Sequence, residues 1–352
     1  MKRFSCQCQA EIFFENTQCA SCGCRLGYLP DLNLMSALEP NANSNVFTAR
    51  LSDNPRGYRR CTNYAQENVC NWTVPVEDGG SFCRSCELNE VIPNLLQPEH
   101  QRYWAKIESA KRRVLYTLYQ LGLPVNRQSD TNPHGLAFKF LADATASTEF
   151  TRSIPGMETI RTGHANGVIT INLAEADDVA RTRERERTGE AYRTLTGHFR
   201  HELGHYYWTV LIQNSPHLDE FRQLFGDETF DYGQALKNYH QNGPPQNWRA
   251  YHISAYCTAH PHEDWAETWA HYLHMVDTLE TAESYGISIE NQAIARGNPS
   301  FDQMLFDWRR LSVALNALNR SMGMPDAYPF VLNPPVERKL TFVHHVIQTA
   351  TA

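Results

Sequence analysis

Apolar and polar residues follow two different periods along this chain, and each period predicts one kind of element. Between Pro98 and Pro124 apolar residues recur every three or four positions, which predicts a helix that stops at Gly122. Its apolar face carries Trp104, Ile107, Val114, Leu118 and Leu121. Two shorter runs, 135–143 and 167–176, start at a glycine, and alternation is clear in the second. They predict a small β-sheet.

Helical spacing dominates the C-terminal half of the chain. An apolar stripe predicts one helix through Leu195, Phe199, Leu203, Tyr206 and Val210. A second helix is predicted to start at Pro261, because proline suits the first turn, and to end before Gly286. Residues 301–323 and 334–350 predict two more helices. A few strands followed by a run of helices indicate an α+β fold.

Charge and composition narrow the classes of function. Lys111, Arg112 and Arg113 are most simply the solvated face of their helix, with nucleic-acid contact as the alternative. The net charge of −7 and the pI of about 6.1 argue against a nucleic-acid partner. No run approaches the roughly 18–20 apolar residues of a membrane span, and no apolar run follows the basic start. We therefore expect a cytoplasmic protein without a membrane partner; the sequence carries no signal for an oligomeric state.

The distribution of cysteines predicts metal binding in the N-terminal region of the chain. Nine of the ten cysteines fall between residues 6 and 86. In a reducing compartment, clustered cysteines bind metal more often than they form disulfides. The first predicted zinc site comprises Cys6, Cys8, Cys19 and Cys22, with Cys24 as the spare that could exchange with Cys22. The second predicted zinc site comprises Cys61, Cys70, Cys83 and Cys86, of which the last two form a CxxC pair.

These clusters suggest a plan for the whole chain. Segments shorter than about 40 residues bury too little apolar surface to fold alone, so zinc would supply the missing folding free energy. We expect a zinc module at 1–28, a connector at 29–55, a second four-cysteine module at 56–95 and the main domain at 96–352. Two structural zinc ions follow from this plan.

The stretch HELGH supplies the residues of a third zinc site. His201 and His205 are four residues apart, so one helical turn places both rings on one face, with Glu202 beside them. A catalytic zinc needs a third protein ligand. On the helix that starts at Pro261, the candidates Glu263, Glu267 and His271 share a face. Trp265 and Trp269 are expected to pack the two helices together.

The segment EDWAETWA resembles the second-helix signature of gluzincin metallopeptidases, in the ExxAE form of lethal-factor-like zinc proteases. The resemblance implies that Glu263 is the zinc ligand and that Glu267 hydrogen-bonds the back of a ligand histidine. It also implies that Tyr256, seven residues before Glu263, faces the developing oxyanion.

The overall layout resembles a bacterial family described as zinc-binding metallopeptidases with an N-terminal zinc ribbon. The stretches CASCG, YRTLTGHFRHELGHYYW and HPHEDWAETWAHYLHMVDTLETA are among the matching stretches, which are spread over nearly the whole chain. The resemblance implies an α+β zincin-like domain with a small sheet, an active-site helix and a helical C-terminal part, preceded by two four-cysteine zinc modules. One departure is Gln9, where the family pattern suggests a glycine that would ease a tight turn.

The expected function is zinc-dependent hydrolysis of peptide bonds in a peptide or protein substrate. Glu202 is the expected general base, and the chain would hold one catalytic and two structural zinc ions. The strand at 167–172 is the candidate edge strand for pairing with substrate, with an interior core strand as the alternative. The alternative function is a zinc-ribbon adaptor that binds proteins through a catalytically silent zincin scaffold.

Overall fold

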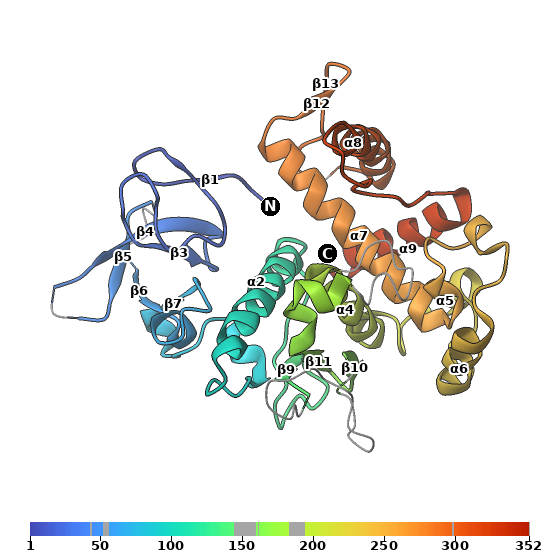
Figure 1. Ribbon diagram of the computed structural model, residues 1–352, viewed down its shortest axis with the longest axis horizontal. Helices are drawn as coiled ribbons and strands as arrows, with labels where there is room; N and C mark the ends of the chain where they lie inside the picture. Colours follow the sequence, from blue (N-terminus) through green and yellow to red (C-terminus); the bar gives the residue numbers. More distant parts are fainter. Residues whose placement is uncertain are drawn as a thin grey trace. The chain divides into compact units, whose positions relative to one another are not determined.

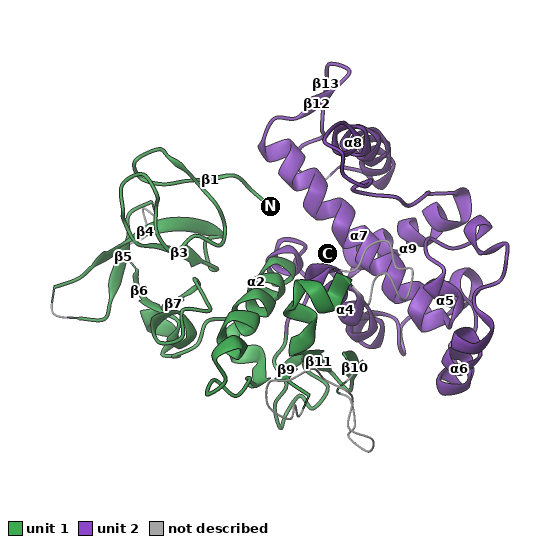
Figure 2. Ribbon diagram, in the orientation of Figure 1, with its two compact units in different colours: residues 1–115, 126–184 green, residues 116–125, 185–352 purple. Residues whose placement is uncertain are grey.

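The computed structural model divides into two compact units (Figure 2). It describes residues 1–42, 44–51, 56–143, 160, 162–182, 194–297 and 299–351. Unit 1 comprises residues 1–115 and 126–184, and unit 2 comprises residues 116–125 and 185–352. Within the described residues, no helix is both long enough and apolar enough to cross a membrane.

Unit 1 begins with the cysteine-rich region. A short antiparallel hairpin, β1 (Phe4–Ser5) and β2 (Glu11–Ile12), is followed by a five-stranded antiparallel sheet in the order β3-β4-β5-β6-β7. Its strands are β3 (Leu26–Leu29), β4 (Leu34–Pro40), β5 (Phe47–Ala49), β6 (Gly57–Arg60) and β7 (Thr73–Pro75). The short helix α1 (Thr62–Ala65) lies between the last two.

The segment expected to be a connector supplies two of these strands. In β4 the four residues 35–38 are all buried, and their backbone pairs with β3 and β5. Asn33, Ser44 and Asn45 lie outside the strands, whereas Ser36 and Pro40 belong to β4, so polar residue types alone do not mark this segment as a loop. The described part of residues 29–55, which lies between the two cysteine clusters in the sequence, therefore belongs to the five-stranded sheet.

Unit 1 also holds a four-stranded mixed sheet in the order β10-β11-β9-β8. The strands are β8 (Asn89–Val91), β9 (Ala137–Leu141), β10 (Gly163–Ala165) and β11 (Val168–Asn172). β11 pairs with β10 on one side and with β9 on the other, so the expectation of an edge strand at 167–172 is wrong. The alternation in the sequence of β11 shows which face of the strand is buried, with Ile169 and Ile171 on that face. It does not show whether the strand has a neighbour on each side, because the hydrogen bonds between strands lie in the plane of the sheet.

The helix α2 (Pro98–Gln120) corrects a second expectation. Lys111 is fully buried and Arg112 is 5% exposed, so only Arg113 belongs to a solvated face. Lys111 Nζ lies 3.0 Å from the carboxylate of Glu108, which is itself buried, and Arg112 donates to the Val69 carbonyl at 2.7 Å. The two cations are buried because each one finds a partner there, which the sequence pattern does not reveal.

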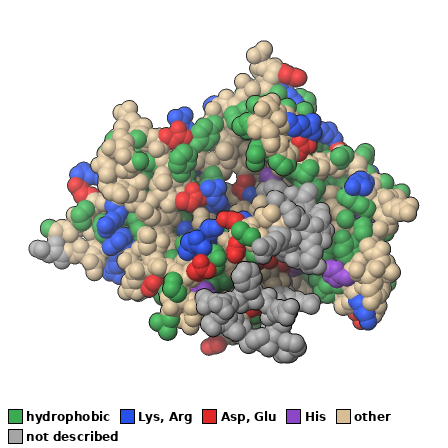
Figure 3. Space-filling view, viewed as in Figure 1, with side chains coloured by type: hydrophobic (Ala, Val, Ile, Leu, Met, Phe, Trp, Pro, Cys, Tyr) green, Lys and Arg blue, Asp and Glu red, His purple; other side chains and the backbone are tan. Residues whose placement is uncertain are grey.

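Surface charge in the described residues is mixed. In the middle of the face shown in Figure 3, Lys and Arg side chains lie next to Asp and Glu side chains. Such neighbours form ion pairs; Lys106 and Asp178, for example, are 2.8 Å apart.

Unit 2 is almost entirely helical (Figure 1). Its helices are α4 (Leu195–Leu211), α5 (Leu218–Phe225), α6 (Tyr232–Asn242), α7 (Pro261–Ser284), α8 (Phe301–Ser321) and α9 (Pro334–Ala350), and a hairpin comprises β12 (Ser288–Ile289) and β13 (Gln292–Ala293). The long helix α7 packs against α4, α5, α8 and α9, so it forms the centre of this unit.

Helices α4 and α7 lie side by side (Figure 1) because small residues meet at their crossing. A Cβ atom added to Gly204 would lie only 2.8 Å from Cα of Ala266. The indole of Trp265 donates to the Gly204 carbonyl at 2.8 Å, and Trp269 stacks on Tyr207 with ring centroids 4.9 Å apart. Both tryptophans are fully buried, which confirms that they pack the two helices together.

The ends of the two helices follow from local sequence. Thr194 caps α4 by accepting from the Gly197 backbone N–H at 3.0 Å. His260 caps α7, and Pro261 occupies its first turn, as expected. Val210, the last residue of the apolar stripe expected in α4, is not part of the buried face, because it is 40% exposed.

Candidate metal centre

The histidine pair lies on one face of α4. The Nε2 atoms of His201 and His205 are 3.2 Å apart. On the other side of the His201 ring, Nδ1 lies 2.8 Å from Oε1 of Glu267. A carboxylate that accepts a hydrogen bond from Nδ1–H favours metal binding through the Nε2 lone pair. The structure thus brings together His201 and the residue expected to orient it.

Glu263 faces the same two ring nitrogens from α7. Its Oε2 lies 3.0 Å from Nε2 of His201 and 3.6 Å from Nε2 of His205. This oxygen is buried and has no hydrogen-bond partner among the described residues. With zinc–ligand bonds of about 2.0–2.2 Å, neighbouring ligand atoms of a tetrahedral site are about 3.3–3.5 Å apart. The three spacings fit that geometry, and the donor set of two imidazoles and a carboxylate fits zinc.

Electrostatics at this group favour a cation. Burial opposes charge on the His201 ring, but the neighbouring carboxylates of Glu263 and Glu267 outweigh burial, so the pKa of His201 is raised well above its ordinary value. Burial likewise opposes charge on Glu263, but His205 and His201 outweigh it and hold the pKa of Glu263 well below its ordinary value. The two carboxylates stabilise positive charge at the His201 ring, and they would stabilise a bound metal cation for the same reason.

Glu202 and Tyr256 flank the group. The Glu202 side chain is 9% exposed and has no hydrogen-bond partner among the described residues. The ring of Tyr256 lies 6.1 Å from the ring of His201, and its hydroxyl also lacks a described partner. Burial first, then the charge of Glu263, raises the pKa of Tyr256 above its ordinary value, so the phenol is neutral. Both side chains are free to act on a bound molecule.

A second tyrosine, which no sequence motif indicates, belongs to the group. Tyr232, the first residue of α6, donates from its hydroxyl to Oε1 of Glu263. Burial first, then the charge of Glu263, raises the pKa of Tyr232 above its ordinary value, so it is a neutral donor. Thirty-one residues separate the two, and no motif spacing links them; only the return of the chain through α6 brings them together.

His271, one of the candidate third ligands, lies outside the group. Its Nδ1 is 2.9 Å from the hydroxyl of Tyr328, and its ring is 6% exposed. Burial lowers the pKa of His271 to about 4, so the ring is neutral. The three residues whose ligand atoms lie within 4.8 Å of one another are His201, His205 and Glu263.

A second group of ligand-capable side chains lies in unit 2 and comprises the half-buried His252 and the buried Cys257 and Asp264. Asp264 Oδ2 accepts from the Lys339 ammonium and lies 3.1 Å from Nδ1 of His252. Burial raises the pKa of the Cys257 thiol well above its ordinary value. The lysine already supplies the cation for Asp264 and the cysteine is a neutral thiol, so this arrangement disfavours a metal ion.

The first cysteine cluster has five thiols for four places. The atoms that lie within 4.8 Å of one another are those of Cys6, Cys19, Cys22 and Cys24, whereas Cys8 Sγ is 3.7 Å from Cys19 Sγ. Cys24 joins the group because Gly23 has a left-handed backbone, φ 71°, which turns the chain back. Its Sγ lies 3.3 Å from that of Cys6. The backbone N–H of Cys24 lowers the pKa of Cys22 to about 6.

The second cluster comprises the four cysteines expected from the sequence. Cys61, Cys70, Cys83 and Cys86 are all buried, and their Sγ atoms lie within 4.8 Å of one another. The Cys70 and Cys83 sulfurs are 3.7 Å apart, close to the roughly 3.8 Å between ligands of a tetrahedral zinc–thiolate site. Backbone N–H groups of Trp72 and Cys83 point at Cys70 and Cys61, each at 3.4 Å.

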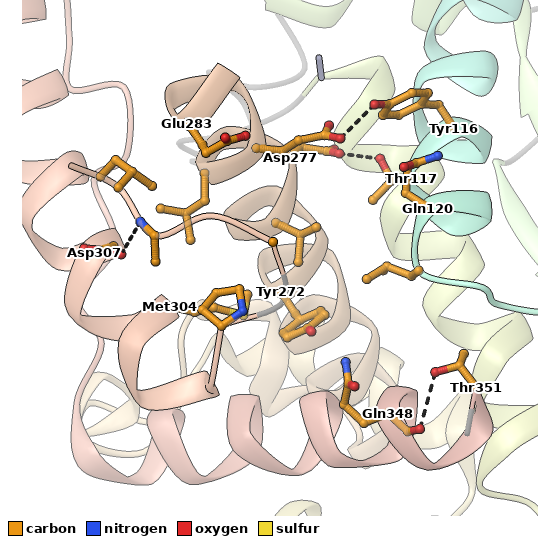
Figure 4. A pocket seen from close by; sticks show the side chains of 18 residues that line it. Tyr116, Thr117, Gln120, Tyr272, Asp277, Glu283, Met304, Asp307, Gln348 and Thr351 are labelled. Atoms are coloured by element: carbon orange, nitrogen blue, oxygen red, sulfur yellow. Dashed lines mark hydrogen bonds between the residues drawn. The ribbon is translucent and has the colours of Figure 1, made fainter. Parts of the chain in front are cut away.

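A cavity of about 360 Å³ lies elsewhere in unit 2, towards the C-terminal end of α7 (Figure 4). Asp277 and Glu280 line it, fourteen or more residues beyond Glu263, which is about 21 Å or more along a helix. Asp277 pairs with Arg200 and accepts from Thr117, and Glu280 accepts from Tyr116 at 2.7 Å. These carboxylates are engaged within the fold, so the cavity is separate from the metal centre.

Comparisons with known proteins show the family to which the chain belongs. A family model described as "Putative zinc-binding metallo-peptidase" matches residues 100–346, and a zinc-ribbon domain model matches residues 3–97. An uncharacterized protein of Mycobacterium tuberculosis is 40% identical over 352 residues, covering 99% of this chain and 95% of the relative. An uncharacterized protein of Mycobacterium bovis has the same identity and coverage. No solved structure matches the chain.

Proposed function

The chain belongs to this family of zinc-binding metallo-peptidases, and we propose that it hydrolyses peptide bonds with Glu202 as the general base. The observation that carries the proposal is the convergence of His201, His205 and Glu263 from two helices, at spacings suited to one zinc ion. Glu202 lies next to His201 in the chain, and its carboxylate has no partner among the residues that the structure describes. This combination is what hydrolysis by an activated water requires.

The roles of the residues follow from their surroundings. Zinc, when bound by these ligands, would acidify a water molecule and polarise the substrate carbonyl. Glu202 accepts the proton of the attacking water and then delivers it to the leaving amine, since no other side chain among the described residues engages its carboxylate. Glu267 accepts a hydrogen bond from Nδ1 of His201 and orients the ring, so that Nε2 would be the nitrogen that binds the metal ion.

Tyr256 completes the proposed catalytic group. Its hydroxyl has no described partner, and its pKa keeps the phenol protonated, so it can donate a hydrogen bond to an oxyanion that forms near the metal position. The contribution of a single oxyanion donor is typically about 10²–10³-fold in rate. The substrate is a peptide or protein.

The two cysteine clusters have a different proposed role. Four thiolates around one zinc ion leave no open coordination position, so such sites stabilise a fold rather than catalyse a reaction. We assign one structural zinc ion to each cluster and one catalytic zinc ion to the histidine pair.

The test separates metal binding from hydrolysis. Wild type, Glu202→Gln and the control Glu220→Gln, an exposed glutamate of α5, are compared for zinc content and for cleavage of a quenched-fluorescence peptide library. We expect Glu202→Gln to keep its zinc and to lose activity by at least about 10²–10⁴-fold, with the control unchanged. A zinc-loaded wild type that cleaves no peptide would reject the hydrolase and favour the adaptor.

A further inference from the structure

The two oxygens of the Glu263 carboxylate have different surroundings. Oε2 faces the Nε2 atoms of His201 and His205 and has no hydrogen-bond partner among the described residues. Oε1 accepts a hydrogen bond from the hydroxyl of Tyr232. Glu263 is 1% exposed, so bulk water does not compete with Tyr232 for Oε1. One oxygen is therefore engaged by the protein, and the other is directed at the metal position.

We propose that Tyr232 is a positioning residue that makes Glu263 a one-oxygen metal ligand. A carboxylate with two free oxygens can bind a metal ion through both, which uses the coordination position that a catalytic site must keep open. A neutral phenol on Oε1 prevents this and holds the plane of the carboxylate. The inference rests on the proposed zinc site and adds to it the residue that sets the coordination number.

The residue that caps α7 also holds the segment that carries Tyr232. Nε2 of His260, the N-cap of α7, lies 3.1 Å from the Phe230 carbonyl, and the His260 ring packs edge-on against Tyr232 with centroids 5.1 Å apart. Asp231 caps α6 through the Gln234 backbone N–H at 2.7 Å. The start of α6 is thus tied to the start of α7, three residues before Glu263, so Tyr232 and Glu263 keep their relative position.

The experiment measures metal binding and does not require hydrolysis. In full-length protein whose cysteine sites already hold zinc, Co²⁺ is titrated into wild type, Tyr232→Phe and Tyr232→Leu, and its affinity and visible spectrum are recorded. The control is Tyr251→Phe, which removes the hydroxyl of a tyrosine that is 54% exposed. We expect both Tyr232 variants to bind cobalt about 10–100-fold more weakly. The visible absorption of their bound cobalt should be weaker, because the site gains a fifth ligand atom. The control should keep the wild-type affinity and spectrum.

A double-mutant cycle distinguishes positioning of Glu263 from a general structural role. In a Glu263→Ala background, Tyr232→Phe should not change the cobalt affinity further, because its target is missing. The inference would be overturned if Tyr232→Phe and Tyr232→Leu kept the wild-type cobalt affinity and spectrum. It would also be overturned if Tyr232→Phe lowered the cobalt affinity as much in the Glu263→Ala background as in wild type. A wild-type chain that binds cobalt but cleaves no peptide rejects the proposed hydrolysis and leaves this comparison intact.

Discussion

The crossing of α4 and α7 at Gly204 provides a direct test of how the metal group is assembled. Gly204 precedes His205 in α4, and it meets Ala266, which is about one helical turn after Glu263 in α7. Gly204→Ala adds one methyl group at this crossing. By helix propensity alone the change would stabilise α4 by about 1 kcal/mol. The packing predicts the opposite result.

The size of the perturbation follows from three distances. The added Cβ would lie 2.8 Å from Cα, 3.2 Å from the carbonyl oxygen and 3.3 Å from Cβ of Ala266. Carbon atoms pack comfortably at about 3.5 Å or more, so the helices must separate locally by about 0.7 Å. Zinc sites tolerate deviations of only about 0.2 Å in ligand distance. Overpacking costs about 1–3 kcal/mol, which outweighs the propensity gain and leaves a net loss of about 1 kcal/mol.

Two measurements check this result. Zinc content per chain should fall by one ion in Gly204→Ala, because Glu263 moves away from the histidine pair, and urea unfolding should show the loss of stability. The matched control is Gly233→Ala in α6, where the added Cβ meets only Asp231 Oδ1 at an ordinary 3.5 Å. The control should keep its zinc and gain up to about 1 kcal/mol. If Gly204→Ala keeps full zinc occupancy and is as stable as wild type, the close approach does not position the ligands.

Three further predictions concern stability and the first cysteine cluster. Gln9 has φ 68°, a conformation that glycine adopts without strain, so Gln9→Gly should raise the free energy of unfolding of the cysteine-rich region by up to about 1 kcal/mol; a lower thermal midpoint would contradict this. The folded-state pKa of His271 is about 4 against 6.5 in the unfolded chain, so its neutral form contributes stability that is complete above about pH 6.5 and is lost as the pH falls towards 4. Between about pH 7 and about pH 5 wild type should lose about 2 kcal/mol more than His271→Gln in urea unfolding, and equal losses would refute the assignment. The grouping of thiols predicts that Cys24→Ala lowers zinc content more than Cys8→Ala does, and the reverse order would return Cys8 to the ligand set.

Much of the metal centre was predictable because its signals are local. An i, i+4 histidine pair must share a helix face, and a Pro-initiated helix with aromatic residues on one side must bury that side. Helices α4 and α7 and the packing of Trp265 and Trp269 follow from these periods. The choice among Glu263, Glu267 and His271 could not be made from spacing, since all three share a face; the resemblance pointed to Glu263, and the geometry groups Glu263 with the histidines.

Local sequence therefore determined the long helices α2, α4, α7, α8 and α9 and the residues that carry metal-binding chemistry, because backbone periodicity and ligand type depend on neighbours a few positions away. Tertiary structure alone decided where charges are buried and which distant residues meet. Arg112 is buried where it donates to the Val69 carbonyl, 43 residues earlier in the chain, and β11 is interior because β9 and β10 flank it. Tyr232 reaches Glu263 because α6 returns to the start of α7. These outcomes depend on partners far away in the chain, and the residue types at each position do not specify them.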